Sequence, residues 1–229
     1  MDFLNALEAY IKEFNERTGE RFAVDTIRIE FNKRYKMEAL RSVGNWYRIN
    51  ANDRRVLSKL QKRLTDDELM SAYKLEGENI YYYNSKRKKR EVAVMVIFGM
   101  KQYHKAPPTR WKIESICKTL TRGTSGNAVN VDVCADMQEE PNIKALKERF
   151  DVMQYTNDKG EFTDTYYIND PFITMIEKIT VYNKAIKNAL SGVLWRVEAL
   201  IEVPNRRSLA LPLFELRGVL ELLRGGNRA

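Results

Sequence analysis

The chain has 229 residues, the size of one ordinary domain or of two small ones. Hydrophobic residues make up 44% of the sequence and charged residues 31%, which argues against wholesale disorder. Lysine and arginine number 39 against 31 aspartate and glutamate residues, and the net charge is +8. This balance favours polyanionic partners, with nucleic acid first and anionic membrane surfaces second.

The scarcity of cysteine and histidine excludes several kinds of chemistry. Cys117 and Cys134 are too few for a disulfide framework or a cysteine zinc site. His104 is the single histidine, so paired-histidine metal clusters are ruled out and histidine-based catalysis depends on His104 alone. The longest apolar run, 92–98, is too short to span a membrane, and residues 1–10 lack the basic start of a secretory signal. We therefore expect a cytoplasmic protein whose chemistry uses carboxylates, tyrosines, lysines and arginines.

The first half of the chain is expected to form two helices, a strand and a hairpin. Apolar residues at helical spacing predict a helix over 2–17, and partial alternation predicts a strand over 21–31. A second helical stripe covers 53–73, with Thr65 and Glu68 as an internal capping box. Strands over 79–83 and 92–98 flank a basic run that predicts a charged hairpin turn. The run consists of Lys86, Arg87, Lys88, Lys89 and Arg90.

The second half alternates helices with strands in hairpins. Helices are predicted over 110–120, 143–149 and 209–223, a short helical or turn segment over 184–190, and strands over 129–136, 154–156, 162–168, 173–182 and 192–203. A turn-forming stretch, 157–160, joins two of these strands. The pattern predicts an α+β fold with a mainly antiparallel sheet. We divide the chain into a main domain, 1–205, and a C-terminal helix and tail, 206–229.

Acidic side chains recur on one face of the strand over 129–136. Asp132, Cys134 and Asp136 share that face because strand side chains alternate. Two carboxylates there repel each other and are tolerated if a divalent cation or basic side chains neutralise them. The other interpretation is a polar strand face that meets solvent.

Two further strands carry side chains suited to phosphate chemistry. Arg196 and Glu198 share a strand face, either as a surface ion pair or as a phosphate clamp beside a third carboxylate. Tyr166 and Tyr167 are neighbours, so one faces away from the other and can point into a site as a nucleophile. Lys184 is a candidate cation nearby. The basic run 86–90 is a candidate contact for the phosphate backbone or a solvated turn.

Four short segments, taken in order, resemble the strand motifs of rolling-circle plasmid replication initiators of the Rep_trans type. The segments are Val131–Asp136, Thr165–Ile168, Ile179–Lys184 and Leu194–Glu198, the last reading L-W-R-V-E. The resemblance covers roughly Ile80 to Val203, and filamentous-phage initiators carry related strands. The chain departs from the family pattern at Asn169-Asp170-Pro171, where the stretch leading to Tyr182 is longer.

The resemblance implies a site-specific DNA nickase, or relaxase, that initiates rolling-circle replication. A tyrosine would attack a phosphodiester, form a 5′-phosphotyrosine link and release a 3′-hydroxyl. Tyr167 would be the nucleophile by its position relative to Thr165 and Ile168, and Tyr166 by counting from Gly160. A divalent metal, Mg²⁺ or Mn²⁺, would be held by Asp132, Asp136 and Glu198, while Arg196 and Lys184 would steady the phosphate.

The resemblance also implies a fold and a set of partners. The fold would be a curved antiparallel sheet with helices packed on it, similar to the TATA-box-binding protein. The partner would be DNA, as a single-stranded or hairpin origin site, and a second copy of the chain and a host helicase are candidate partners. The alternative hypothesis is a basic DNA-binding protein on the same fold that does not cleave, and a third is a protein-interaction module with an incidentally basic surface.

Overall fold

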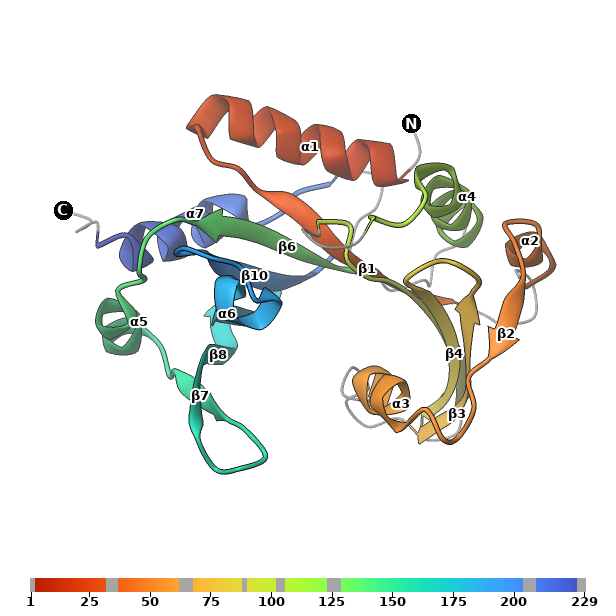
Figure 1. Ribbon diagram of the computed structural model, residues 1–229. Coiled ribbons are helices and arrows are strands. Elements are labelled where there is room, and N and C mark those ends of the chain that lie inside the picture. Colours follow the sequence, from red (N-terminus) through yellow and green to blue (C-terminus); the bar gives the residue numbers. More distant parts are fainter. Residues whose placement is uncertain are drawn as a thin grey trace. The chain divides into compact units, whose positions relative to one another are not determined.

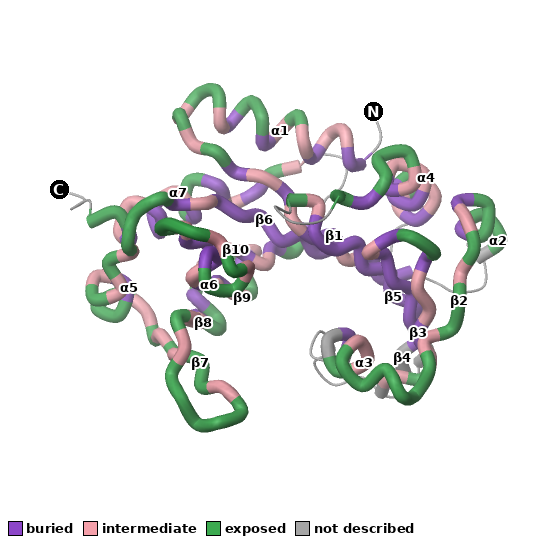
Figure 2. The backbone as a smooth tube through the Cα atoms, viewed as in Figure 1, coloured by how far each residue is buried: buried purple, intermediate pink, exposed green. Residues whose placement is uncertain are grey.

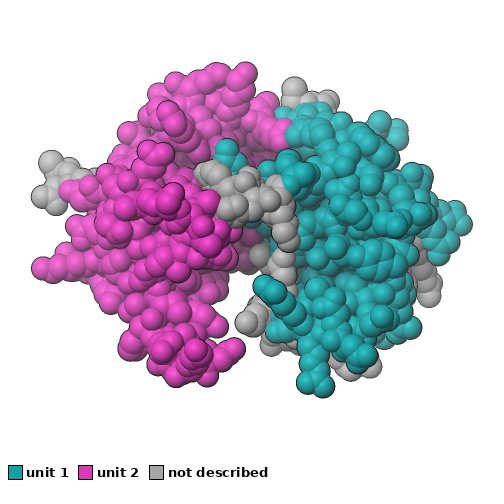
Figure 3. All heavy atoms as spheres, in the orientation of Figure 1, with its two compact units in different colours: residues 1–6, 25–130 teal, residues 7–24, 131–229 magenta. Residues whose placement is uncertain are grey.

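The computed structural model describes residues 3–31, 37–61, 68–87, 90–101, 106–122, 129–203 and 209–225. Within these ranges the chain is an α+β protein with ten strands of a large antiparallel sheet and seven helices, which confirms the predicted class (Figure 1). The structure divides into two compact units, shown in Figure 3. Unit 1 comprises residues 1–6 and 25–130, and unit 2 comprises residues 7–24 and 131–229.

Unit 1 is built on a meander of strands. In hydrogen-bonded order these are β2 (Trp46–Arg48), β3 (Glu68–Leu75), β4 (Ile80–Arg87), β5 (Arg90–Ile97) and β1 (Ala23–Phe31), whose first two residues belong to unit 2. Its helices are α2 (Met37–Arg41), α3 (Arg54–Gln61) and α4 (Arg110–Thr121). The strand β4 bends along its length in Figure 1. Helix α3 packs Leu60 against Tyr83, Val94 and Val96, so its apolar stripe covers β4 and β5.

The predicted helix over 53–73 is wrong in its second part. Among the described residues of this segment, Arg54–Gln61 is helical and Glu68–Leu75 is the strand β3. Thr65, the expected cap, lies outside the described residues. Tyr73 pairs with Tyr82 of β4 and their rings stack with centroids 5.2 Å apart. Pairing with an aromatic neighbouring strand therefore overrides the local helical spacing.

The predicted basic hairpin is confirmed in its backbone. The strands β4 and β5 pair from Ile80 opposite Ile97 to Arg87 opposite Arg90. Lys88 and Lys89 lie outside the described residues, and so do the side chains of Lys86, Arg87 and Arg90. Their expected contact with a phosphate backbone therefore stays a prediction.

Unit 2 holds the other five strands and four of the described helices. In hydrogen-bonded order its strands are β6 (Val129–Met137, from residue 131), β10 (Trp195–Glu202), β9 (Ile176–Asn183), β8 (Phe162–Ile173) and β7 (Met153–Thr156). Its helices are α1 (Phe3–Thr18, from residue 7), α5 (Ile143–Arg149), α6 (Lys184–Asn188) and α7 (Leu213–Leu223). Figure 2 shows β6 and β10 as buried along most of their length.

Helix α7 is part of the compact body of unit 2. It buries Leu213, Leu216, Leu220 and Leu223 and packs against α5. Phe214, at its first turn, meets Phe14 of α1 edge to face, with ring centroids 4.9 Å apart. The predicted boundary between 1–205 and 206–229 falls within residues 204–208, which lie outside the described residues, and stays a prediction. None of the described helices is both long enough and apolar enough to cross a membrane.

The turn from α1 into β1 depends on one asparagine. Asn15 Nδ2 donates to the Phe22 carbonyl at 2.8 Å, and the Phe22 amide donates to Asn15 Oδ1 at 2.9 Å. Gly19 adopts φ of 76°, where glycine carries no steric cost, and its amide donates to the Asn15 carbonyl. One side chain thus satisfies both backbone groups of Phe22.

Replacing Asn15 by alanine removes both hydrogen bonds and leaves the Phe22 amide and carbonyl without these partners. We expect Asn15→Ala to lower the free energy of unfolding by about 1–3 kcal/mol in urea denaturation. The control is Lys12→Ala on the same helix, because its ion pair with Glu16 is exposed and contributes little. Equal stability of the two variants would contradict a structural role for Asn15.

Candidate active site

The register of three neighbouring strands brings the predicted catalytic side chains to one face of the unit 2 sheet. Tyr167 of β8 lies opposite Thr180 of β9, and Thr180 lies opposite Glu198 of β10. Residues that are directly opposite on paired strands project from the same face. The adjacent row on that face contains Tyr182 and Arg196, which are themselves paired. Tyrosine, glutamate and arginine from segments far apart in sequence therefore share one surface.

Arg196 forms the centre of this face. Its side chain is buried, and it donates to both oxygens of Asp136, from Nε at 2.5 Å and from Nη2 at 2.9 Å. Its Nη1 lies 3.8 Å from Oε1 of Glu198. Burial alone would lower the pKa of the Arg196 guanidinium, but the hydrogen bonds and charge of Asp136, with Cys134 and Tyr182, raise that pKa. Arg196 is therefore a permanent buried cation shared by two carboxylates.

Tyr182 completes the surroundings of Glu198. Its hydroxyl donates to Glu198 Oε1 at 2.7 Å. The ammonium of Lys187, on α6, lies 4.0 Å from the centre of the Tyr182 ring. This distance is typical of a cation–π contact. Glu198 is thus held from two sides, by a guanidinium and by a phenol.

Tyr167 is half-buried beside cationic and aromatic neighbours. The ammonium of Lys178 lies 4.0 Å from the centre of its ring, and Tyr155 meets the ring edge to face at 6.1 Å. Burial, and after it the nearby Tyr155 and Glu198, raise the pKa of the Tyr167 phenol. Thr180 is the one residue between Tyr167 and Glu198 in the row.

Tyr166 projects from the opposite face. It pairs with Val181, which pairs with Val197, and its ring stacks on Trp195 with centroids 6.5 Å apart. Gln154 Nε2 donates to its hydroxyl at 3.4 Å. Burial, followed by Asp164 and Glu140, raises the pKa of the Tyr166 phenol. Of the two adjacent tyrosines, the register therefore places Tyr167 on the face of Glu198 and Arg196.

Asp132 and Lys184, the other residues predicted for metal binding and catalysis, also belong to unit 2. Asp132 is buried on β6, two and four residues from Cys134 and Asp136 on the same strand face. Lys184 is also buried, at the first position of α6, where its amide donates to the Leu194 carbonyl at 2.8 Å. Within the described part of the chain, no three His, Cys, Asp or Glu side chains come together as a group that could hold a metal ion.

Two residues of this face were not singled out from the sequence. Lys178 and Tyr182 lie on β9, in alternation with Thr180, and both therefore project toward the site. The signal that could have found them is this alternation, read outward from Thr180. This alternation identifies the two residues only when the pairing of β9 with β10 is known. The alternation alone does not show which face of β9 belongs to the candidate site.

Comparisons with known proteins give one structural similarity. No family model matches the sequence, and no curated protein matches it. A solved structure that is similar is the rolling circle replication initiator protein from Geobacillus stearothermophilus, at 15% identity and a TM-score of 0.45. The similarity covers 79% of this chain and 74% of that chain.

The ion pair between Arg196 and Asp136 gives a test of how the site is held together. Arg196→Met leaves the Asp136 carboxylate in a partly buried position without the guanidinium, and we expect a loss of about 3–5 kcal/mol in the free energy of unfolding. The double variant Arg196→Met with Asp136→Leu replaces the pair by apolar side chains. It should recover much of the loss in urea denaturation, and losses that simply add would contradict a direct coupling.

Proposed function

We propose that the chain is a DNA-nicking and strand-transferring enzyme that initiates rolling-circle replication with a tyrosine nucleophile. The observation that carries this proposal is the register of β8, β9 and β10, which sets Tyr167 in one row with Glu198 and beside the row of Arg196. The net charge of +8 and the four strand motifs support DNA as the substrate.

The reaction would be an in-line displacement at phosphorus. The Tyr167 oxygen forms a bond to phosphorus and the bond to the 3′ oxygen breaks, which leaves a 5′-phosphotyrosine and a 3′-hydroxyl. The phenol gives up a proton and the leaving oxygen takes one up, so the step is balanced in charge and protons. Because burial raises the pKa of the Tyr167 phenol, a neighbouring group has to accept the phenol proton during the attack.

The sheet face that carries Tyr167 also carries groups that could accept this proton and stabilise the charge. Glu198 is the carboxylate in the same row, and it is the candidate acceptor for the phenol proton. The ammonium of Lys178 over the Tyr167 ring would favour the negative charge that develops on the phenol oxygen. Arg196 would act through Glu198 and Asp136 by holding their carboxylates in place.

A divalent metal, Mg²⁺ or Mn²⁺, is part of the proposal as a predicted cofactor. The carboxylates of Asp132, Asp136 and Glu198 are hard oxygen donors, the kind that such ions prefer. In the described arrangement both oxygens of Asp136 accept from Arg196, so an ion would have to share these carboxylates with the guanidinium. When bound, it would neutralise charge on the phosphate oxygens.

The nucleophile can be tested by deleting one oxygen. Tyr167→Phe should keep the fold and the affinity for DNA but lose covalent attachment to a single-stranded oligonucleotide, measured as a protein–DNA adduct on a denaturing gel. The stability cost should stay below about 1 kcal/mol, because the phenol lies at a half-buried site rather than in the core.

Tyr166→Phe is the matched control for this experiment. Its ring faces the other side of the sheet and stacks on Trp195, so adduct formation should persist. An inactive Tyr166→Phe beside an active Tyr167→Phe would move the nucleophile by one residue. Full adduct formation by the double variant would remove the tyrosine mechanism.

One observation favours a second candidate function, a DNA-binding protein that does not cleave. Arg196 already pairs with Asp136 and lies 3.8 Å from Glu198 within the protein, so both carboxylates have a cation beside them without a metal ion or a substrate phosphate. In that case the affinity of the wild-type protein for DNA would fall steeply with salt, and no covalent protein–DNA adduct would form in the presence of any metal ion.

The cofactor can be tested separately by thermal unfolding. Binding of Mn²⁺ to the folded state should raise the melting temperature of the wild-type protein in a concentration-dependent way. Asp132→Asn should reduce this increase, whereas Asp158→Asn, in the exposed hairpin turn between β7 and β8, should not. An unchanged melting temperature of the wild-type protein would remove the metal from the mechanism.

A further inference from the structure

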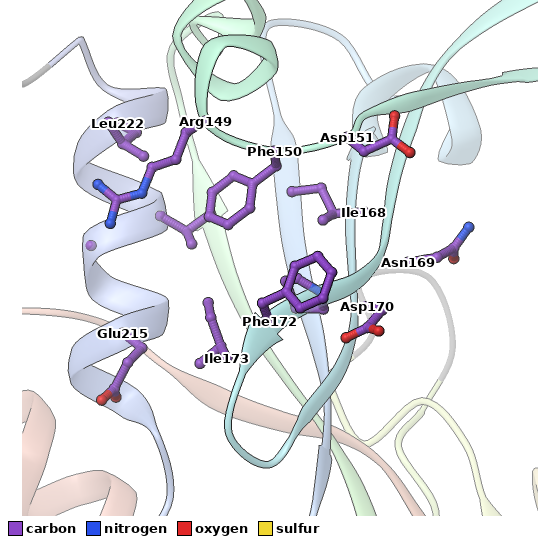
Figure 4. Close-up of a pocket in the computed structure, with 13 residues that line it drawn as sticks. Arg149, Phe150, Asp151, Ile168, Asn169, Asp170, Phe172, Ile173, Glu215 and Leu222 are labelled. Carbon is purple, nitrogen blue, oxygen red and sulfur yellow. The ribbon is translucent and has the colours of Figure 1, made fainter.

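A pocket of about 520 Å³ opens in unit 2 beside the end of β8 (Figure 4). Its walls come from three places: the C-terminal end of α5, the last six residues of β8, and one side of α7. None of the residues singled out in the sequence for catalysis or metal binding lines it. It is therefore distinct from the face that carries Tyr167, although both use the same strand.

The backbone of β8 is strained where it borders this pocket. Pairing with β9 is regular up to Asn169 and resumes only at Ile173. Between them Asp170 and Phe172 adopt φ of 52° and 56°, a left-handed conformation that is unusual for any side chain and an outlier for a bulky one. Strained backbone conformations cluster at active sites and ligand contacts, although turns such as that at Met175 also contain them.

One of these two strained residues, Phe172, exposes a large apolar side chain to water. Phe172 is 93% exposed, whereas its neighbour Pro171 is buried. Phe172 lines the pocket together with Phe150 and Asp170, as Figure 4 shows. Both the left-handed backbone and the exposed ring are unfavourable for the isolated protein, which points to a ligand that contacts this ring.

The walls of the pocket indicate the chemistry of that ligand. Phe150, Ile168 and Phe172 provide apolar and aromatic surface that suits a flat ring. Three carboxylates and a single arginine also line the pocket, so its charge opposes a phosphate group. Carboxylates instead accept hydrogen bonds from the amino groups of bases. The lining charged residues are Asp151, Asp170, Glu215 and Arg149.

The pocket also lies within reach of the proposed nucleophile. Asp170 is three positions along the strand from Tyr167, a distance of about 10 Å. The strand β7 pairs with β8 only as far as Tyr167, so beyond that residue β8 forms the edge of the sheet. A DNA strand with a phosphate at Tyr167 can therefore pass around this edge toward the pocket.

We propose that this pocket, the base pocket, binds one unpaired nucleobase that carries an amino group, with the base stacked on Phe172 and its amino group directed to the carboxylates. The inference rests on the proposed nicking function, because it identifies part of the substrate of the same site. The bound base would lie a short way along the strand from the scissile phosphate and would position it at Tyr167.

The test is binding of the full-length protein to single-stranded homo-oligonucleotides of dA, dC and dT, measured by fluorescence anisotropy. The wild-type protein should bind dA and dC more tightly than dT. Phe172→Ala should weaken binding to dA and dC by roughly tenfold or more, because stacking of one base is lost. Phe172→Gly should do the same while it relieves the left-handed strain, so a folding defect cannot explain the loss.

Two variants serve as matched controls. Phe162→Ala removes another exposed phenylalanine of β8 that does not line the pocket, and its affinity should equal that of the wild-type protein. Asp170→Asn removes a charge but tolerates the left-handed backbone. It should reduce the preference for dA and dC over dT.

The covalent adduct at Tyr167 separates this inference from the proposed function. If Phe172→Ala and Phe172→Gly bind every oligonucleotide as tightly as the wild-type protein while the adduct still forms, the base pocket is wrong and the nickase remains. If the Phe172 variants alone lose affinity and no adduct forms with any DNA, the base pocket stands and the cleavage function fails. If the wild-type protein binds no single-stranded DNA, both are overturned.

Discussion

The buried guanidinium of Arg196 is the interaction on which the candidate active site depends. A charge removed from water is costly, and it is tolerated only when carboxylates compensate it with good geometry. Asp136 on β6 and Glu198 on β10 meet that requirement. The pair fixes β10 against β6, and the ladders to β9 and β8 then decide which face Tyr167 occupies. A slip of one residue in any of these ladders would turn the tyrosine away.

Much of unit 2 could be predicted from alternation in the sequence, but its site could be predicted only in part. Alternation alone shows that Asp132 shares a face with Asp136, and that Tyr166 and Tyr167 face opposite sides. It does not show that β6 neighbours β10, since the residues joined by the ion pair are 60 positions apart. The partner of Arg196 and the choice of tyrosine both depend on that long-range pairing.

Unit 1 illustrates the opposite limit, in which a local pattern predicts the wrong structure. The apolar residues of 68–75 continue the helical stripe of α3, and periodicity extends that helix through them. The same residues pair with β4, where Tyr82 stacks on Tyr73 and Trp46 of β2 meets Tyr82 edge to face. Strand propensity is set by such cross-strand neighbours rather than by the segment itself. The pattern of one segment contains no information about these cross-strand neighbours, so it cannot predict the strand.

The distribution of charge on the face that carries Tyr167 bears on how a phosphate could approach it. Asp136 and Glu198 carry two negative charges against the single positive charge of Arg196, so this cluster alone would repel DNA. The ammonium groups of Lys178 and Lys187 each lie 4.0 Å from the ring of a site tyrosine, and they are more exposed than Arg196. These more exposed ammonium groups offer positive charge to an incoming phosphate, which suits the attack by Tyr167 proposed above.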